Sequence, residues 1–473
     1  MQNTPSERII EITNAQKTYF KSGKTLDVHY RKHSLKRLLT AIEMNEELLA
    51  KALLIDLHKS YEEAYLTEIS IIKAEIKSHI KSLSKWAAKK RVTTPLHLYP
   101  SKSYIVKEPL GTTLIIAPWN YPVQLLLNPL IGAISAGCTA LLKPSPYVPT
   151  VASVIEKIIK ENFNEEYIAV VQGDRTVNTL LLEQRWDLIF FTGSPSLGRT
   201  VMSAAAKNLT PVILELGGKS PCIIDHTANL KVAAKRVAWG KTLNCGQTCI
   251  APDYILIHKD VKEQFIQYFA EAIKQLHYSS IENKTDSSHI FPDRFYVHMV
   301  NEKAFDRVTG YIKEGNIIYG GKFNKDSLLI EPTLIENMPS DSKAMTEEIF
   351  GPVFPVVTLD DTGKPFKEKA IEFVNSREKP LAFYYFGEES NGWDIIARTS
   401  SGGGCINDVI MHIANDNLPF GGVGNSGMGS YHREKSFEAF SHARSILVSG
   451  TFIDLPFRYM PYKFFKLIKK ILN

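Results

Sequence analysis

The first 90 residues repeat apolar positions at intervals of three and four, with charged side chains between them. The stretches SLKRLLTAIEMNEELLAKALLIDLHKS and AEIKSHIKSLSKWAAKK both follow this spacing. It is the spacing of one face of an α-helix, so we expect amphipathic helices packed on a core. Residues 100–109, PSKSYIVKEP, alternate apolar and polar positions instead and predict an exposed or edge strand.

From residue 112 the pattern changes to short apolar runs, each followed by turn residues and a helical segment. TTLIIA, TALLK, EYIAVV and WDLIFF follow this scheme, and PVILEL closes the series. Strands that alternate with helices predict a parallel sheet covered on both faces. A second series of this kind begins near residue 221, with PCIID, YILIH and LAFYYF as its strands. The predicted fold class is therefore α/β.

The most apolar long stretch, residues 113–142, has the length of a transmembrane helix. Pro118, Pro122, Asn128 and Pro129 interrupt it, and no continuous run of about 18 apolar residues remains. We therefore expect a buried strand, a turn, a buried helix and a second strand.

Composition narrows the class of protein without fixing its function. The chain has 473 residues, of which 44% are hydrophobic and 22% charged, as in globular proteins of two or three domains. The net charge of +6 is mild, and without a basic and aromatic stripe it predicts no nucleic-acid partner. Five widely spaced cysteines and a polar N-terminus favour free thiols and a cytoplasmic location.

Ligands of parallel sheets bind where the strands end, so the residues after each strand are the candidates for chemistry. Asn120, between two prolines, is either a rigid donor for an oxyanion or a turn residue. Lys143 either contacts a ribose or phosphate or is a surface lysine. The turn from Gly193 to Gly198 precedes a helix whose N-terminus can receive a diphosphate. Arg199 stands where a phosphate-binding P-loop has lysine, which makes a P-loop ATPase the weaker hypothesis.

Glu215 ends the otherwise apolar strand PVILEL. A buried carboxylate without a partner has a raised pKa and can act as a general base near neutral pH. A structural glutamate held by a salt bridge fits the pattern equally well.

The stretch NCGQTCIAP, residues 244–252, contains Cys245 and Cys249. A zinc site would need two further Cys or His ligands nearby, and a redox pair is usually C-x-x-C, so we expect no metal and no redox pair. A nucleophilic thiol needs a lowered pKa and a polar, donor-rich loop. We predict that Cys249 is the nucleophile and Cys245 a bystander.

These residues belong to motifs that resemble a known family. PWNYP, KPS, FTGS, ELGGKSP, GQTCIAPDY, EEIFGPV and LPFGGVGNSGMGSYH occur in the order seen in NAD(P)-dependent aldehyde dehydrogenases. The resemblance runs from about residue 8 to residue 450, and residues 412–442 look like the class 3 branch, which includes fatty-aldehyde enzymes.

The resemblance implies roles for individual residues. Cys249 would attack the aldehyde carbon, Asn120 and the Cys249 backbone N–H would hold the oxyanion, and Glu215 would activate the water that hydrolyses the thioester. The implied cofactor-binding residues are Trp119, Lys143, Gly193, Ser194, Gly198, Glu348 and Phe350. The implied substrate residues are Tyr65, Tyr121 and His412, for medium- or long-chain aliphatic or aromatic aldehydes. A cysteine hydrolase without cofactor and a non-catalytic binding protein are the competing classes.

One position departs from the family pattern. Many members carry a glutamate after KPS or KPA that binds the adenosine ribose hydroxyls, and this chain has Pro146 there. Loss of that carboxylate removes repulsion toward a 2′-phosphate. The expected cofactor is therefore NAD or NADP, with NADP at least tolerated.

The resemblance also implies how the chain is divided. Residues 1–88 and 108–216 would form a Rossmann-like, doubly wound cofactor-binding domain, and 217–425 a catalytic α/β domain. Residues 89–107 and 426–450 would form a small β oligomerisation flap, with YIVKEPL and ARSILVSG as its strand pair in a homodimer.

Residues 451–473 form an amphipathic, basic tail. Phe464, Ile468, Ile471 and Leu472 share one face of an expected helix, and most of the lysines lie on the other. Residues 456–473 either contact the inner face of an anionic membrane peripherally or cap the partner subunit or the substrate tunnel.

Overall fold

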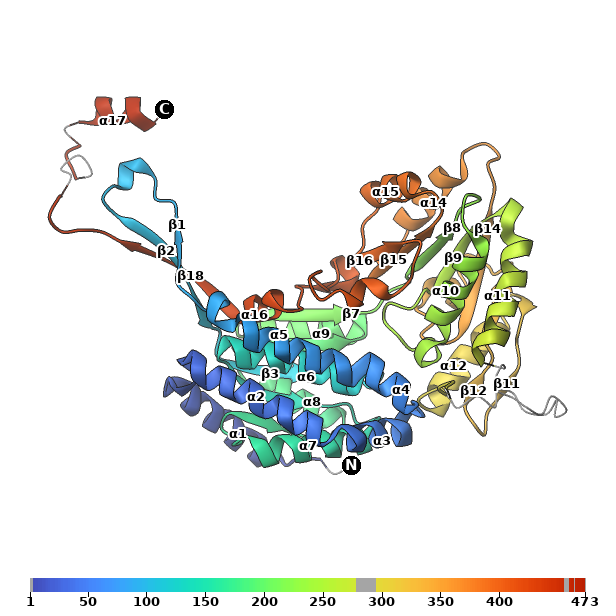
Figure 1. Cartoon of the computed structure of the whole chain (residues 1–473), viewed down its shortest axis with the longest axis horizontal. Coiled ribbons are helices and arrows are strands. Elements are labelled where there is room, and N and C mark those ends of the chain that lie inside the picture. The colour runs from blue at the N-terminus through green and yellow to red at the C-terminus, as the bar shows by residue number, and fades with distance from the viewer. Residues whose placement is uncertain (1–2, 278–294, 455–458, 463, 473) are drawn as a thin grey trace.

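The computed structural model describes residues 3–277, 295–454, 459–462 and 464–472. A six-stranded and a seven-stranded sheet form the two halves of the body, and a three-stranded sheet projects from it (Figure 1). The predicted α/β class, with a doubly wound parallel sheet and a second α/β unit, is confirmed.

The helical N-terminal segment is also confirmed. Its helices are α1 (Ser6–Lys21), α2 (Val28–Met44), α3 (Glu46–Leu57), α4 (Tyr61–Ala64) and α5 (Ser70–Trp86). Asp27 caps the start of α2, where its side chain accepts a hydrogen bond from the His29 N–H, and Ser60 caps α4, where its side chain accepts one from the Glu63 N–H. These side chains satisfy N–H groups that the first turn of a helix leaves without a partner.

The six-stranded sheet has the strand order β17-β7-β6-β3-β4-β5. Its parallel strands and their helices are β3 (Thr112–Ile116), α6 (Pro122–Ala136), β4 (Thr139–Lys143), α7 (Pro149–Asn162), β5 (Ile168–Val170), α8 (Arg175–Glu183), β6 (Leu188–Gly193), α9 (Pro195–Ala206) and β7 (Val212–Leu216). Residues 113–142 are thus strand, turn, helix and strand, as predicted. No helix in the described part of the chain is long and apolar enough to cross a membrane.

The two faces of this sheet pack against different helices. Leu114 and Ile116 pack with α1, α8 and α9 on one face. Ile115 and Leu142 pack with α2, α5, α6 and α7 on the other. Successive side chains of a strand point to opposite faces, so a strand buried on both sides is apolar at every position. This explains why TTLIIA and TALLK show no alternation.

The seven-stranded sheet has the order β10-β13-β14-β9-β8-β15-β16, and all its neighbours are parallel except β10 and β13. Its strands are β8 (Pro221–Ile224), β9 (Tyr254–His258), β10 (Asn316–Tyr319), β13 (Thr333–Glu336), β14 (Val353–Leu359), β15 (Ala382–Phe386) and β16 (Gly403–Ile406). Its helices are α10 (Leu230–Thr242), α11 (Lys262–His277), α12 (Glu302–Ile312), α13 (Lys343–Thr346), α14 (Phe366–Asn375) and α15 (Glu389–Arg398). A short pair, β11 (Phe323–Asn324) and β12 (Leu329–Ile330), stands apart from it.

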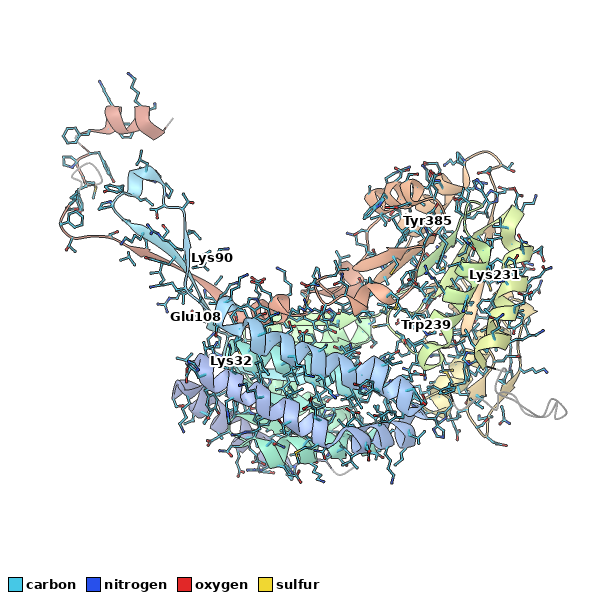
Figure 2. All side chains as sticks on the ribbon, in the orientation of Figure 1. Lys32, Lys90, Glu108, Lys231, Trp239 and Tyr385 are labelled. Carbon is cyan, nitrogen blue, oxygen red and sulfur yellow. The ribbon has the colours of Figure 1, made fainter. Side chains whose placement is uncertain are left out.

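The projecting sheet contains β1 (Lys90–Val92), β2 (Lys102–Pro109) and β18 (Ser441–Val448). β2 pairs antiparallel with β18 along its whole length, so the two candidate flap segments do lie side by side. The alternation predicted an exposed or edge strand, whereas β2 is the middle strand of the three and is half-buried along most of its length. Figure 2 shows Lys90 on this flap and Glu108 near its base, whereas Trp239 and Tyr385 belong to the body.

The segment 426–450 divides between two sheets. Strand β17 (Gly427–Met428) adds to the edge of the six-stranded sheet, helix α16 (Glu434–Ala439) follows it, and only β18 lies in the flap. The last helix, α17 (Phe465–Leu472), lies beyond the flap and away from the body (Figure 1). The proposed domain boundaries stay a prediction.

Candidate functional site

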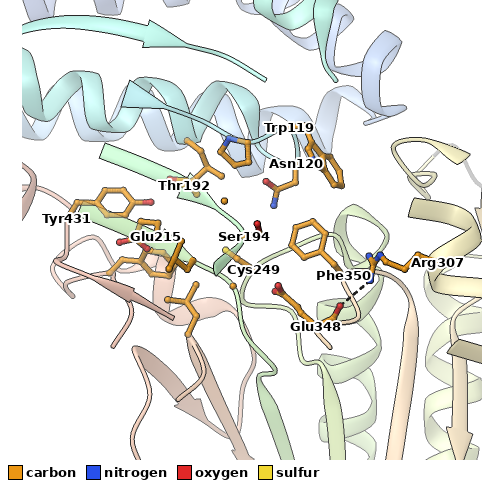
Figure 3. A pocket seen from close by; sticks show the side chains of 17 residues that line it. Trp119, Asn120, Thr192, Ser194, Glu215, Cys249, Arg307, Glu348, Phe350 and Tyr431 are labelled. Atoms are coloured by element: carbon orange, nitrogen blue, oxygen red, sulfur yellow. Dashed lines mark hydrogen bonds between the residues drawn. The ribbon is translucent and has the colours of Figure 1, made fainter. Parts of the chain in front are cut away.

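A cavity of about 280 Å³ lies where the two halves of the body meet. Figure 3 shows residues from both halves facing one another across it. Its lining residues are Pro118, Trp119, Asn120, Leu125, Thr192, Gly193, Ser194, Glu215, Leu216, Gly217, Cys249, Arg307, Glu348, Phe350, Leu381, Phe420 and Tyr431. The residues that follow β3, and those that end β6 and β7, form one wall, as expected for the carboxyl edge of a parallel sheet.

The cysteine loop has an unusual backbone. Asn244, Cys245 and Gly246 all have positive φ values, of 51°, 55° and 70°. Left-handed backbone costs free energy for residues other than glycine, so the surrounding structure must hold it in place. Gly246 also has the Gly351 carbonyl against it, 2.5 Å from where a Cβ would stand.

Side chains of the NCGQT stretch supply that support. The Asn244 backbone N–H donates to Glu63, and its side-chain amide donates to the carbonyls of Asn120 and Gln247, both within 3.1 Å. The Gln247 amide donates to the His298 carbonyl and accepts from the Val300 N–H. The polar residues around the two cysteines therefore build the loop and fix its position against the first sheet.

Asn120 is held from both ends. Its side-chain amide donates to the Gln247 carbonyl at 3.0 Å, and its own carbonyl accepts from Asn244 and from the Lys59 ammonium at 2.8 Å. Lys59 in turn pairs with Glu68 at 2.7 Å, and Glu68 accepts the N–H of Val123 at the start of α6. Asn120 is thus a fixed amide in the cavity wall and not a mobile turn residue.

The two cysteines differ in surroundings. Cys249 lines the cavity, whereas Cys245 is fully buried near Tyr296 and Met299 in a separate apolar cluster. All five cysteines are free. The expectation of a lowered pKa for Cys249 is wrong: burial raises its pKa, and the Glu348 and Glu215 carboxylates raise it further by repelling a thiolate.

Glu215 is buried at the end of β7, and neither carboxylate oxygen has a hydrogen-bond partner in the described part of the chain. Burial raises its pKa well above the usual value. No ion pair involving Glu215 is found among the described residues, which removes the hypothesis of a salt-bridged structural glutamate. The geometry is that of a proton acceptor facing a cavity.

Glu348 and Gly217 meet at one side of the cavity. A Cβ at Gly217 would lie 2.2 Å from the Glu348 carboxylate, so a larger residue there would displace that carboxylate. Burial raises the pKa of Glu348 to about 8. Phe350 packs edge-on against Trp119 with ring centroids 5.6 Å apart, which joins the two walls.

Gly193 and Ser194 line the cavity, and Ser194 caps the N-terminus of α9 by accepting from the Leu197 N–H. A helix N-terminus beside a cavity suits a phosphate group. Gly198 does not line the cavity: it is buried against Leu216, where a Cβ would come within 2.7 Å. Its contribution is the close packing of α9 on β7.

Lys143 lies outside the cavity lining but is not a surface lysine. Its side chain is buried and donates to the Pro144 carbonyl, and burial lowers its pKa to about 8. A buried ammonium at the end of β4 is available to a polar ligand at this edge of the sheet.

The three expected substrate residues do not line the cavity. The Tyr121 hydroxyl bonds Thr248 at 2.7 Å, and the Lys59 ammonium lies over its ring. Tyr65 stacks on Tyr61. His412 stacks on Phe420, and it is Phe420, not His412, that lines the cavity. Tyr121 and His412 therefore lie behind the lining, and Tyr65 stacks at the helical N-terminal segment.

Several lining residues were not anticipated from the sequence: Leu125, Thr192, Arg307, Leu381, Phe420 and Tyr431. Phe420 and Tyr431 belong to LPFGGVGNSGMGSYH, a stretch singled out as a motif without any role for its side chains. Arg307 lies on α12, and its side chain donates a hydrogen bond to the Glu348 carbonyl at 3.1 Å. Nothing in the helical pattern of α12 indicates that contact.

Comparisons with known proteins agree with this geometry. The family model described as the aldehyde dehydrogenase family matches residues 1–446. The 4,4'-diaponeurosporen-aldehyde dehydrogenase of Staphylococcus aureus is 45% identical over 96% of each chain. The dimeric NADP-preferring aldehyde dehydrogenase of Canis lupus familiaris is 41% identical over 96% of this chain and 98% of its own.

Solved structures give the same result. A substrate-bound state of Staphylococcus aureus AldH superposes with a TM-score of 0.93 at 44% identity, covering 98% of this chain and 99% of that one. A betaine aldehyde dehydrogenase of Staphylococcus aureus in complex with NAD⁺ reaches a TM-score of 0.84 at 26% identity, covering 97% and 93%.

Proposed function

The chain belongs to the aldehyde dehydrogenase family, and from that premise we propose a mechanism, a substrate class and a cofactor tolerance for it. As a member, it is an NAD(P)-dependent enzyme that oxidises aldehydes to carboxylic acids. The observation that carries the mechanism is that Cys249, Glu215 and Asn120, from three separate segments, line one cavity.

In the proposed first step, the Cys249 sulfur bonds to the aldehyde carbon while the thiol proton passes to solvent water. The negative oxygen that forms is held by the Asn120 amide and the Cys249 backbone N–H, which are donors fixed in place beforehand. A nicotinamide cofactor, when bound in this cavity, would supply the acceptor for the hydride that leaves the same carbon. The thioester left on Cys249 is then hydrolysed by water that Glu215 deprotonates.

Glu348, Phe350 and Trp119 would hold the nicotinamide end of the cofactor, and Gly193 and Ser194 its diphosphate. One observation favours this fit: the N-terminus of α9, which Ser194 caps, lies beside the cavity. Lys143, buried at the end of β4, would reach the adenosine ribose.

We further propose that the preferred aldehydes are apolar, of medium or long aliphatic chain or aromatic. The cavity wall contains Leu125, Leu381 and Phe420 beside the reacting groups. Burial of apolar substrate against such side chains contributes about 25 cal/mol per Å². The Staphylococcus aureus relative named above is itself named for a 4,4'-diaponeurosporen-aldehyde.

Cofactor choice and assembly extend the proposal. Pro146 in place of the usual glutamate supports use of NADP as well as NAD, and a canine relative is named NADP-preferring and dimeric. The flap formed by β1, β2 and β18 is suited to joining two subunits. A cytoplasmic location is proposed on the five free cysteines, and peripheral membrane contact is proposed on the composition of the tail alone.

The testing experiment follows reduced-cofactor absorbance with NAD and NADP in turn, against hexanal, a long-chain aldehyde and benzaldehyde. Wild type should give a signal, and Cys249→Ala should give none. Glu215→Gln should release about one reduced cofactor per subunit and then stop, because acylation proceeds while hydrolysis does not. A folded wild type with no signal from either cofactor would instead favour a cysteine hydrolase.

A further inference from the structure

Tyr431 is a buried side chain that faces the cavity without a partner for its hydroxyl. It is 1% exposed and lines the cavity, and its oxygen has no hydrogen-bond partner in the part of the chain that the structure describes. Buried hydroxyl groups are nearly always hydrogen-bonded, because leaving one unpaired costs about 1–3 kcal/mol. An unpaired hydroxyl in a cavity wall therefore points to a ligand.

The ring of Tyr431 is held rigidly. Phe190, Phe420 and His432 surround it edge-on, with ring centroids between 4.8 and 5.8 Å away. Its backbone exchanges two hydrogen bonds with Phe420. The hydroxyl is thus fixed in position, and the protein does not turn it toward an acceptor of its own.

Chain topology brings Tyr431 to the end of β7. Gly427 of strand β17 lies directly opposite Glu215 in the antiparallel pair, and the chain turns back at Gly429 with a φ of 84°. Figure 3 shows Tyr431 and Glu215 on the same side of the cavity. Burial raises the pKa of Tyr431, and Glu215 and Cys249 raise it further, as expected for groups around one space.

Glu215 is the second polar group here without a partner, since both its oxygens are unpaired among the described residues. The two groups do not bond each other, yet they face the same cavity. Two polar groups separated in this way are bridged by a water when the space is large enough, and about 280 Å³ is ample for one.

We propose that Tyr431 binds the hydrolytic water together with Glu215. The water oxygen bonds to the thioester carbon, and Glu215 takes one water proton. The carbon–sulfur bond then breaks, and the Cys249 sulfur leaves and recovers that proton, which yields the free acid and the thiol. The Tyr431 hydroxyl fixes the water at the correct side of the carbonyl carbon. The inference rests on the proposed function and adds a water-binding residue to it.

The test is Tyr431→Phe, which removes one oxygen and keeps the ring. Acylation of Cys249 and hydrolysis of the thioester are both followed with an aldehyde and NAD(P). They are followed separately with 4-nitrophenyl acetate without cofactor. The ester acetylates Cys249 as 4-nitrophenolate leaves, and water then hydrolyses the same thioester. Tyr167→Phe is the matched control, because Tyr167 is equally buried and does not line the cavity.

In both assays, we expect Tyr431→Phe to show an initial burst of the same rate and size as wild type. The steady rate that follows should be about three- to tenfold lower than that of wild type. The acyl-enzyme should accumulate as a mass increase on Cys249. Hydroxylamine, which attacks the thioester directly to give a hydroxamate, should restore turnover to near the wild-type rate. The control should behave as wild type.

An unchanged steady rate, or an equal fall in burst rate and steady rate, would overturn the role in hydrolysis. The ester assay separates this inference from the proposed function. If wild type reduces no cofactor but still shows an ester burst that Tyr431→Phe slows only in its second phase, the dehydrogenase proposal fails and Tyr431 keeps its role.

Discussion

The Lys59 ammonium lies 2.7 Å from the Glu68 carboxylate, and neither side chain has any exposed surface. The same ammonium donates to the Asn120 carbonyl, and the other oxygen of Glu68 accepts the Val123 N–H at the start of α6. The pair therefore connects the N-terminal helices to the oxyanion donor. Buried charges are costly unless fully paired, so each partner depends on the other.

Replacement of Lys59 by Met should destabilise the protein by about 3–5 kcal/mol, because Glu68 is left buried without its counter-charge. The double variant Lys59→Met/Glu68→Gln should recover much of that loss, since glutamine can still accept from Val123. Urea denaturation measures both. Lys73→Met is the control: its pair with Glu46 is partly exposed and should cost under about 1 kcal/mol.

Loss of Lys59 should also lower kcat more than it raises KM, because the Asn120 carbonyl loses a donor while the cavity lining stays intact. If the double variant is as unstable as the single one, the pair is not the source of the loss. If kcat is unchanged in the double variant, Lys59 does not position Asn120.

Gly217→Ala should impair cofactor use without unfolding the chain. The new methyl group would meet the Glu348 carboxylate, which must then move away from the nicotinamide site. We expect a rise of about tenfold or more in the KM for the cofactor, about 1.4 kcal/mol. Gly310→Ala in α12, where a Cβ meets nothing, should instead stabilise the protein by about 0.5–1 kcal/mol. An equal KM for the cofactor in Gly217→Ala and Gly310→Ala would contradict the assignment of Glu348 to the nicotinamide site.

Glu348 makes stability depend on pH in a defined direction. Glutamate in the unfolded chain loses its proton near pH 4.5, whereas the buried Glu348 keeps it up to about pH 8. The folded state binds more protons in this window, so this contribution to stability is present below pH 4.5 and is lost as pH rises toward 8. The advantage of wild type over Glu348→Gln should therefore shrink from pH 5 to pH 8 in urea denaturation. An advantage that grows with pH would contradict the raised pKa.

The strands of the first sheet and the main site residues followed from the sequence because they depend on local patterns. The apolar runs between helical segments predicted β3, β4, β6 and β7. In the structure, residues at the ends of β6 and β7 and after β3 form one cavity wall. Asn120 and Glu215 were found this way. Cys249 was found by excluding metal and redox pairs, and its separation from Cys245 agrees with that choice.

Other features depended on contacts between distant segments, which periodicity does not record. Lys59 falls in a stretch whose spacing predicts an amphipathic helix, yet it lies between α3 and α4 and is fully buried, paired with Glu68. Burial raises the pKa of Cys249, and Glu348, which is distant in the sequence, faces the thiol and raises this pKa further. Tyr431 reached the cavity through the short strand β17, too brief to show any alternation.

Pro146→Glu tests the cofactor proposal. A carboxylate at this position would accept hydrogen bonds from the ribose hydroxyls of NAD and repel the 2′-phosphate of NADP. The ratio of kcat/KM for NAD over that for NADP should rise by about tenfold or more, about 1.4 kcal/mol. A wild type that already prefers NAD by that ratio would show that Pro146 does not confer NADP tolerance. Pro146→Ala is the control for loss of the proline ring alone.

The tail prediction concerns residues 451–473. Phe464, just before α17, and Phe465, at its start, are exposed away from the body, and Lys466, Lys469 and Lys470 lie on the same helix. Aromatic side chains that enter the lipid headgroup region and lysines that pair with anionic lipid would act together. The full chain should sediment with vesicles that contain phosphatidylserine, and binding should weaken in high salt because salt screens charge. Vesicles of phosphatidylcholine alone should bind little.

A chain truncated after Gly450 should lose this binding and keep its activity on hexanal. Lys466→Glu/Lys470→Glu is the matched variant of full length, in which the apolar positions remain and only the charge reverses. If the truncated chain binds anionic vesicles as well as the full chain does, the tail is not the membrane contact. If truncation instead changes the subunit number or the KM for long aldehydes while vesicle binding is absent throughout, the tail covers the partner subunit or its substrate entrance.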